Sequence, residues 1–252
     1  MKRKDRQYRF YATLLDTFEG YLNCDKIYQQ YYGRSNDPKV SEDEFAQTKY
    51  LELIDKINRV PREFSAAADR GIAFNLVLDW CITGQRSDEI EVIKANDYAI
   101  VVEYNNEQYP FPRSILLPIV ERIKDGLMQV WLEGYLQTTK GRVKLCGYTD
   151  AVMPFKITDV KTTKQYKAFK YRDGWQADVY MYCARCEGFE VSEFEYLVTD
   201  FKKVYTETYT WQEDTESKLV GICEQFIDFI DQHEKVITDE RIYNLEPQKV
   251  VS

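Results

Sequence analysis

Three strand-like segments follow one another between residues 128 and 162, and this succession constrains the fold more than any other feature of the chain. The segments are MQVWLEGYL and RVKLCGYTDAVM, which flank the turn TTKGR, and KITDVKT, which follows Pro154. Strand patterns joined by short turns predict antiparallel neighbours. A helix-like segment from about Gly174 to Arg185 comes next. We therefore expect an antiparallel three-stranded unit followed by a helix.

The first sixty residues are expected to be helical. The segment YATLLDTFEGYL carries apolar residues at roughly helical spacing. Ser41 and Glu44 have the spacing of a capping box and precede FAQTKYLELIDKI, so they predict the start of a second helix. Pro61 is expected to end that helix.

Downstream of Pro61 the chain alternates between helical and strand patterns. A helix is predicted from about Phe64 to Ile82, with Ser65 near its start and Gly84 just beyond its end. The other predicted elements are a β region from Glu89 to Tyr109 with a turn at KAND, a short helix near Ile115 to Ile123, the strands EFEYLVT and VYTETYTW, and a closing amphipathic helix from about Asp214 to Lys235.

No internal repeat, low-complexity tract or Pro/Gly/Ser-rich linker divides the 252 residues. With 44% apolar and 30% charged positions, the chain is long enough to bury a sizeable core. We expect one α/β domain over residues 1–252. Within it, residues 1–60 would form a helical N-terminal part, 64–212 the core, and 213–252 a C-terminal helix and tail.

Composition excludes several classes of protein. The longest stretch without Asp, Glu, Lys or Arg is the eight residues from Gly71 to Leu78, whereas a membrane-spanning helix needs about 20 apolar residues. The N-terminus MKRKDRQYRFYATLL lacks the apolar region of a secretory signal, and six cysteines suit a reducing compartment, so we expect a cytoplasmic protein. A net charge of −8 argues against a histone-like protein.

Catalysis based on histidine is also improbable, because His233 is the only histidine. One histidine argues against multi-histidine zinc sites, and its place in a helix-like stretch argues against a Ser-His-Asp triad. No phosphate-binding loop of the form G-x-x-x-x-G-K-[ST] and no dinucleotide fingerprint G-x-G-x-x-G occurs. Any catalysis is therefore expected to depend on carboxylates, lysines or metal ions.

Two aspartates and a lysine stand out in the second and third strands. Asp159 and Lys161 are two positions apart, so their side chains leave the same face of a strand. Asp150 ends the segment Gly147-Tyr148-Thr149-Asp150, and antiparallel pairing would bring it beside Asp159. The pattern [DE]-x-K also occurs at residues 37–39, 200–202 and 216–218, but only this occurrence follows G-x-x-D and precedes Gln176 and Tyr180 on a helix.

These motifs resemble those of the PD-(D/E)XK nuclease superfamily, in the branch typified by the RecB nuclease domain and lambda exonuclease. That branch carries G-x-x-D, [DE]-x-K and Q-x-x-x-Y after a helix motif G-x-x-x-H-x-x-[LF]-E. Here the helix motif reads GIAFNLVLD from Gly71, with Asn75 in place of the histidine and Asp79 in place of the glutamate. The resemblance implies a restriction-endonuclease-like core, a mixed central sheet flanked by helices, with helical additions at the N-terminus.

The resemblance also implies an activity. Asp150, Asp159 and the carbonyl of Val160 would hold one or two Mg²⁺ or Mn²⁺ ions, with Asp79 as a third acid. Lys161 would orient or deprotonate the attacking water, and Gln176 and Tyr180 would line the site. The implied function is hydrolysis of DNA phosphodiesters, by an exonuclease of the phage or of the recombination and repair type, acting with a possible homo-oligomer or recombination partner protein.

A basic strip follows the lysine. Its members are Lys164, Lys167, Lys170 and Arg172, interleaved with Tyr166, Phe169 and Tyr171. From residue 159 to 172 the local charge is +4 in a chain of −8. Such a strip could follow a phosphate backbone and stack aromatic rings on bases, although a run of charges can also be a solvated face.

Two other functions remain open. The first is a nucleic-acid-binding module whose catalytic centre has decayed, which the missing helix histidine would explain. The second is an iron-sulfur nuclease of the CRISPR-adaptation type, which would use cysteines. Four of the six cysteines are candidate ligands, namely Cys24, Cys183, Cys186 and Cys223. Cys183 and Cys186 are equally explained as small residues on an amphipathic helix.

Overall fold

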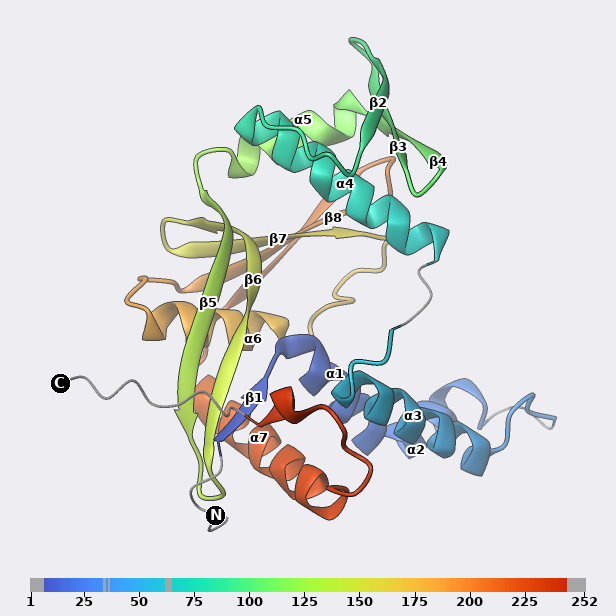
Figure 1. Ribbon diagram of the computed structural model, residues 1–252, viewed down its shortest axis with the longest axis vertical. Coiled ribbons are helices and arrows are strands. Elements are labelled where there is room, and N and C mark those ends of the chain that lie inside the picture. The colour runs from blue at the N-terminus through green and yellow to red at the C-terminus, as the bar shows by residue number, and fades with distance from the viewer. Residues whose placement is uncertain (1–6, 34, 36, 62–64, 244–252) are drawn as a thin grey trace.

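The computed structural model describes residues 7–33, 35, 37–61 and 65–243. Within them the chain forms an α/β fold with a mixed six-stranded sheet and a separate three-stranded sheet (Figure 1). The six-stranded sheet has the order β1-β6-β7-β8-β9, with β5 paired to β6. Its strands are β1 (Gln7–Phe10), β5 (Leu127–Gln137), β6 (Arg142–Met153), β7 (Lys156–Thr162), β8 (Glu193–Thr199) and β9 (Val204–Thr210).

The predicted antiparallel unit is confirmed as β5, β6 and β7. β5 pairs along nearly the whole of β6, from Gln137 opposite Arg142 to Leu127 opposite Val152. β7 pairs only with the end of β6, over Ala151–Met153. Beyond β7 the sheet becomes mixed, because β8 runs parallel to β7 and β9 antiparallel to β8.

The prediction that the first sixty residues are helical is wrong at their start. Residues Gln7–Phe10 form β1, which pairs in parallel with Arg142–Leu145 of β6. Tyr8 and Phe10 are fully buried, and Gln7 and Arg9 are half-buried. A strand of four residues is too short for its alternation of buried and exposed positions to be recognised. Its partner lies more than 130 positions further along the chain, so no local sequence pattern predicts the pairing.

Helices follow β1 as predicted. They are α1 (Ala12–Leu22), α2 (Cys24–Tyr31) and α3 (Glu42–Ile57). α1 and α3 are the two helices that the sequence predicts, whereas α2 was not predicted as a separate helix. The capping box is present: the Ser41 hydroxyl accepts a hydrogen bond from the Glu44 N–H, and the Glu44 carboxylate accepts one from the Ser41 N–H. α3 ends at Ile57, before Pro61.

The next helix is α4 (Ala66–Thr83). Ser65 caps its start and Gly84 follows its end in the left-handed conformation, with φ of 72°. The β region then contains three strands, β2 (Glu91–Ala95), β3 (Ala99–Tyr104) and β4 (Glu107–Pro112), of which β4 was not anticipated because two prolines interrupt its pattern. Asn105 and Asn106 turn between β3 and β4 with positive φ, as a two-residue hairpin turn requires.

The remaining helices are α5 (Arg113–Ile123), α6 (Gln176–Cys186) and α7 (Thr215–Gln232). They agree with the predicted short helix, the helix after the third strand and the closing helix. A short 3-10 helix, η2 (Glu240–Ile242), comes last. In the described residues, no helix has the length and apolar character needed to cross a membrane.

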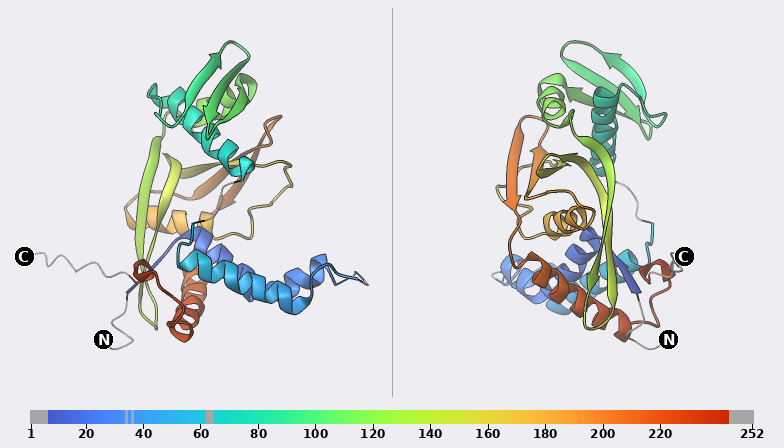
Figure 2. Two further views of the ribbon diagram at one scale, coloured as in Figure 1. Left: turned by 45° about the vertical axis from the view of Figure 1, so that its right-hand side comes forward. Right: turned by 90° about the vertical axis from the view of Figure 1, so that its left-hand side faces the viewer.

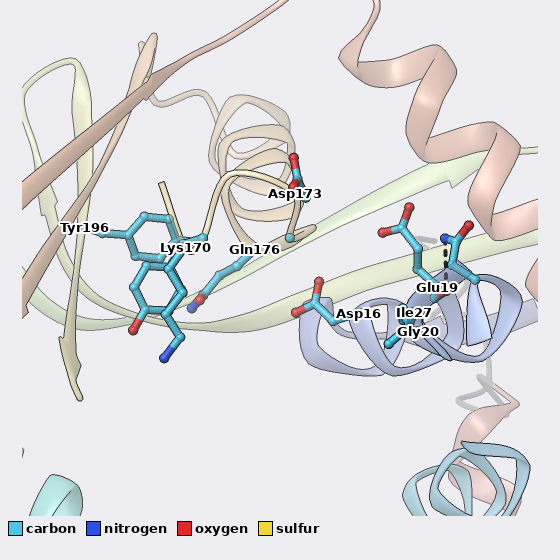
Figure 3. Close-up of a pocket in the computed structure, with 11 residues that line it drawn as sticks. Asp16, Glu19, Gly20, Ile27, Lys170, Asp173, Gln176 and Tyr196 are labelled. Atoms are coloured by element: carbon cyan, nitrogen blue, oxygen red, sulfur yellow. Dashed lines mark hydrogen bonds between the residues drawn. The ribbon is translucent and has the colours of Figure 1, made fainter. Parts of the chain in front are cut away.

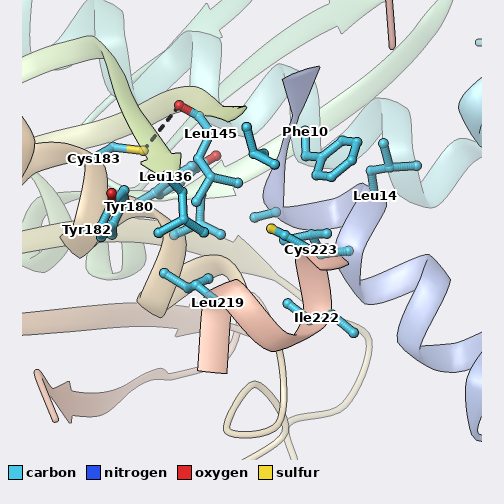
Figure 4. Packing of buried hydrophobic residues seen from close by; sticks show 14 of the residues in the cluster. Phe10, Leu14, Leu136, Leu145, Tyr180, Tyr182, Cys183, Leu219, Ile222 and Cys223 are labelled. Carbon is cyan, nitrogen blue, oxygen red and sulfur yellow. Dashed lines mark hydrogen bonds between the residues drawn. The ribbon is translucent and has the colours of Figure 1, made fainter. Parts of the chain in front are cut away.

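One face of the large sheet is covered by α1, α6 and α7. α7 presents apolar side chains at helical spacing, and Phe226 packs on Phe10 of β1 and Phe18 of α1 with ring centroids 4.7 and 4.6 Å apart. Figure 4 shows Leu136 and Leu145 of the β5–β6 hairpin against Leu219 of α7 and the tyrosines of α6. This packing holds α6 against β6.

The other face of the sheet is covered by α4, α5 and the small sheet. Val160 of β7 and Leu197 of β8 are neighbours in the register and pack with Phe74 and Val77 of α4. These elements gather at one end of the molecule, while α1, α2, α3 and α7 lie at the other (Figures 1 and 2). Because side chains alternate along β7, Asp159 and Lys161 face away from this second cluster.

Candidate active site

The aspartates of the two motifs meet where β6 and β7 separate. The last pair in their ladder is Ala151 with Thr158, so Asp150 and Asp159 are the next residues on the two strands. Beyond this point the Val160 N–H donates to the Asp150 carboxylate at 2.7 Å. A side chain thus replaces the backbone acceptor that a continuing ladder would supply. The predicted proximity of Asp150 and Asp159 is present in the structure.

Asp159 is held from two sides. Its Oδ2 lies 2.7 Å from Lys161 Nζ, and its Oδ1 accepts a hydrogen bond of 2.7 Å from Gln176 Nε2. Asp159 is only 4% exposed, and burial raises the pKa of its carboxyl group, while Lys161 and Gln176 lower it. The charged lysine and the amide donor therefore compensate for removing this carboxylate from water.

Asp150 is the second acid of the cluster. Burial, followed by repulsion from Asp159, raises the pKa of Asp150 to about 7, against the opposing effects of the Val160 N–H and Lys161. Gln129 Nε2 also donates to Asp150 Oδ1, over 3.5 Å. A buried carboxyl group whose pKa is raised by a neighbouring carboxylate is stabilised by a proton or a cation.

Gln176 and Tyr180 are brought to the site by α6. Gln176 is the first residue of that helix and Tyr180 lies one turn further on, so both project from one side of the helix. Tyr180 lies against Gly147 of β6: a Cβ added at Gly147 would be 2.5 Å from Cε1 and 2.8 Å from the hydroxyl of Tyr180. The glycine of the G-x-x-D motif therefore makes room for the tyrosine of the Q-x-x-x-Y motif.

Asp79 approaches the cluster from the opposite face of the sheet. It hydrogen-bonds to Gln129, which in turn contacts Asp150, and its charge contributes to the raised pKa of Asp150. The structure brings Asp79 near the site through Gln129 rather than into direct contact with Asp159.

Asn75 and Gly71 share this helical face. Gly71 lies against β7, since a Cβ added there would be 2.9 Å from Thr162 Oγ1. Asn75 is one turn from both Gly71 and Asp79, so the three residues share one side of α4. Its Oδ1 is buried and has no hydrogen-bond partner in the part of the chain that the structure describes.

These groups can be compared with the needs of a divalent cation. Carboxylates, amide oxygens and peptide carbonyls are the ligands of Mg²⁺ and Mn²⁺, and the unpartnered oxygen of Asn75 and the repulsion between Asp150 and Asp159 would both be relieved by a cation. Among the described residues, however, no group of three or more His, Cys, Asp and Glu side chains is arranged to hold a metal ion. The oxygen atoms of Asp150, Asp159 and Asn75 are of the kind that binds a hard cation. Within the described residues, the structure brings two acids together, Asp150 and Asp159, and not three.

A cavity of about 530 Å³ opens beside Gln176 and Tyr196. Figure 3 shows Asp16 of α1 across this cavity from Gln176. Asp16 Oδ1 accepts a hydrogen bond of 2.7 Å from the Trp175 N–H, at the start of α6, and its charge interacts favourably with Lys161. The N-terminal helix therefore helps to fix the end of α6 that carries Gln176.

The basic strip lies in the loop between β7 and α6. Lys164, Lys167, Lys170 and Arg172 are all exposed. Two of the interleaved aromatic residues hold the loop in place: Tyr166 stacks on Tyr205 at 4.0 Å, and Tyr171 on Tyr196 at 4.8 Å. Phe169 is 62% exposed and is the ring of the strip that remains open to a ligand.

The cysteines considered for a cluster lie apart. Cys24 is on α2, Cys223 on α7, and Cys183 and Cys186 on α6, and all are free thiols. Cys183 is buried and its thiol donates to the Leu145 carbonyl. The positions of these side chains fit the reading as small residues of amphipathic helices.

Three residues of the site were not anticipated. Gln129 could have been found, because it stands opposite Asp150 once the hairpin register is set. Asp16 and Tyr196 could not, because their approach depends on how α1 and β8 pack against the site. Tyr196 is the register neighbour of Asp159, and Lys161 Nζ lies 5.9 Å from its ring centroid.

No protein-family model and no curated protein matches this chain. Among solved structures, the chain is similar to the crystal structure of SSO0001 at 13% sequence identity and a TM-score of 0.42. The alignment covers 88% of this chain and 76% of that one. A similarity of this size supports no conclusion about function.

Proposed function

We propose that this chain is a divalent-metal-dependent nuclease that hydrolyses DNA phosphodiesters, as its motifs suggest. The observation that carries the proposal is the cluster of Asp150, Asp159 and Lys161 at the separation of β6 and β7, with Gln176 hydrogen-bonded to Asp159. Separate motifs, on two strands and a helix, supply these residues.

We propose further that the core is restriction-endonuclease-like. In support, the element order α4, β5, β6, β7, α6 carries the motifs in the order of that family, on a mixed sheet with helices against both faces. The exonuclease activity and the phage or repair setting belong to the same proposal and rest on the sequence motifs.

Each residue has a definable role in this proposal. Asp150 and Asp159, with the peptide of Val160, would hold the cation, and Asp79 with Asn75 would complete its surroundings from α4. A bound Mg²⁺ or Mn²⁺ would supply Lewis-acid stabilisation of the phosphate oxygens and a more acidic water. Gln176 fixes the rotamer of Asp159 through its hydrogen bond, and Tyr180 fills the space beside Gly147.

Lys161 is the group suited to act on water and phosphate. Its ammonium pairs with Asp159, and its side chain remains 29% exposed, so it reaches from the buried acids toward solvent. In that position it can orient a water molecule and offset negative charge that develops on the phosphate. The exposed lysines that follow would bind the adjacent backbone.

The test is digestion of linear, nicked and closed-circular DNA side by side with Mg²⁺ or Mn²⁺. We expect Asp159→Asn and Lys161→Met each to lower the rate by at least about 100-fold, the scale of losing one group that stabilises a transition state. Glu216→Gln and Lys218→Met are matched controls, because they alter the same [DE]-x-K spacing on α7. Wild-type rates in either site variant would overturn the assignment.

A nucleic-acid-binding module is the second candidate. Two observations favour it. No group of three or more potential metal-binding side chains forms among the described residues, and Lys161 forms a salt bridge with Asp159. If no strand is cut under any metal condition while DNA binding persists, this second function is correct and the first is not.

A further inference from the structure

A second pocket, of about 600 Å³, lies just past the end of β7. Its walls come from the first turns of α4, from β4, from the residues after Lys161, and from the turn between β8 and β9. Thr162, which lines it, directly follows Lys161, but neighbouring side chains on a strand point to opposite faces. The pocket is therefore close to the candidate active site in the chain, but Asp150, Asp159, Lys161, Gln176 and Tyr180 do not line it. Its volume is within the range of pockets that bind small ligands, about 300–1,000 Å³.

The central group of this pocket is Arg70 of α4. Its guanidinium lies over the ring of Phe201, 3.7 Å from the ring centroid. Its Nε is buried without a hydrogen-bond partner among the described residues, and no carboxylate in that part of the chain forms an ion pair with it. Burial lowers the pKa of Arg70, and among the described residues only Tyr109 opposes this shift. A partly buried cation without an anion is costly, so the pocket favours an anionic ligand.

Tyr109 of β4 is a second unsatisfied group in the same pocket. It is only 8% exposed, and its hydroxyl is buried without a hydrogen-bond partner in the described residues. A phenol can donate to a phosphate oxygen as the guanidinium does. Two donors from different elements thus line one pocket, and neither has a hydrogen-bond partner among the described residues.

The wall that carries Phe201 is preformed. Phe201 has a positive φ of 63°, and its N–H donates to Thr199 Oγ1 at 2.9 Å. Asp200 Oδ1 accepts from the N–H groups of Lys202 and Lys203, so the only acid lining the pocket is engaged by its own turn. A non-glycine residue held in this conformation costs about 1 kcal/mol, and such strain persists where the surrounding structure fixes it.

The rim of the pocket adds positive charge. Lys164 and Lys202 line it, both are exposed, and neither forms a salt bridge with another described residue. The pocket thus combines an arginine packed on an aromatic ring, a buried phenol and two exposed ammonium groups. Arginine and lysine together are the usual recognition groups for phosphate.

We propose that this pocket binds a nucleotide phosphate, at a position distinct from the one cut at Asp150, Asp159 and Lys161. The choice of a nucleotide as the phosphate donor rests on the proposed nuclease function, whereas the anion preference rests on the pocket alone. The phosphate belongs either to the strand being cut or to a free mononucleotide, and both present the same chemistry to Arg70.

The experiment measures binding of three probes to the full chain carrying Asp159→Asn: inorganic phosphate, thymidine monophosphate, and a short oligothymidylate without terminal phosphates. We expect Arg70→Met to weaken binding of at least one probe by about tenfold or more, the scale of one charge-assisted contact. If thymidine monophosphate responds, the pocket takes mononucleotides, whereas a response to inorganic phosphate alone would overturn the nucleotide assignment. If only the oligothymidylate responds, the occupant is a phosphate within a strand.

Two controls keep the outcome clear. Arg142→Met removes a similar arginine, 3.9 Å from the Tyr135 ring centroid at the other end of the β5–β6 hairpin, and should leave binding unchanged. Lys164→Met and Lys202→Met alter exposed side chains that do not contribute to the core, so they should weaken binding without lowering the melting temperature.

The proposal is overturned if Arg70→Met changes no probe. It is also overturned if Arg70→Met lowers the melting temperature while both lysine variants bind like the parent. The nuclease assignment fails separately, if the Asp159→Asn chain still cuts DNA, and that result would leave the measured phosphate affinity intact.

Discussion

At the scale of single residues, the site is defined by which side chains have room beside others. The Tyr180 ring occupies the space that a side chain at residue 147 would need, and glycine leaves that space free. Tyr180 in turn follows Gln176 on α6, and Gln176 holds Asp159. A methyl group at residue 147 therefore acts on the acids through two intermediate contacts.

Gly147→Ala should disturb both stability and activity. The added Cβ would lie 2.5 Å from Tyr180 Cε1, so the ring or the strand must shift, at a cost of about 1–3 kcal/mol. Gly221→Ala is the matched control, because nothing lies within 4 Å of its Cβ, and the gain in helix propensity should stabilise the protein by up to about 1 kcal/mol. Urea denaturation measures the free energy of unfolding of both variants. Equal values would show that the Tyr180 ring can move aside at no cost in stability.

The raised pKa of Asp150 predicts a pH dependence of stability. The ordinary pKa of an aspartate is about 3.9, so between about pH 4 and 7 the folded protein binds more protons at this group than the unfolded chain. The free energy of unfolding should therefore fall as the pH rises through this interval. Asp150→Asn keeps an acceptor for the Val160 N–H and removes the charge, so it should abolish this part of the dependence.

The measurement is urea denaturation at pH 5 and pH 8 with a chelator present. We expect the variant to gain about 1–2 kcal/mol over the wild type between these pH values, less than the full shift implies because Asp150 is partly exposed. Mn²⁺ should restore wild-type stability at pH 8 and have little effect on the variant. A constant difference between the two proteins across this pH range would contradict the raised pKa that burial and repulsion from Asp159 give Asp150.

The residues of the site were largely predictable where strand periodicity and hairpin register decide their positions. Asp150, Asp159 and Lys161 follow from the β6–β7 pairing, and Gln176 and Tyr180 from one turn of α6. Asp79 was placed on the correct helical face, but its distance from the acids depends on how α4 crosses the sheet. The aromatic residues of the strip were expected to face a ligand, whereas Tyr166 and Tyr171 stack on the protein itself.

At the scale of elements, local signals identified the helices better than the strands. The caps at Ser41, Ser65 and Gly84 mark helix ends through contacts within four residues. β1 and β4 were missed because the first is short and the second contains prolines. β1 pairs with β6, which is far along the chain, and such a pairing cannot be predicted from the residues next to β1.

Ser41→Ala tests the capping box of α3. It removes the hydroxyl that accepts from the Glu44 N–H, and we expect a loss of about 1 kcal/mol of stability. Ser114→Ala, at an exposed position in the first turn of α5, is the control and should be neutral or slightly stabilising. DNA cleavage at a temperature where both proteins are folded should not change. Reduced cleavage by Ser41→Ala would show that α3 acts on the site as well as on stability.

At the scale of the whole molecule, the charge is distributed unevenly. The chain carries a net charge of −8, yet its exposed loop between β7 and α6 is basic and lies beside the candidate active site. Non-specific attraction of DNA to the whole surface is therefore unfavourable. Binding that depends on this loop should be local, salt-sensitive and independent of basic residues elsewhere.

Two triple variants with the same net charge separate local from overall electrostatics. One replaces Lys167, Lys170 and Arg172 with glutamine; the other replaces Lys94, Lys218 and Lys235, on β2, on α7 and after it. If the loop contacts three phosphates, the first variant should lower the slope of log affinity against log salt concentration by about 2–3. The second should leave that slope unchanged, because none of its lysines belongs to the loop. Fluorescence anisotropy with labelled DNA at several salt concentrations measures both slopes. Equal losses in the two variants would mean that DNA responds to the overall charge, and the loop would then have no special part in binding.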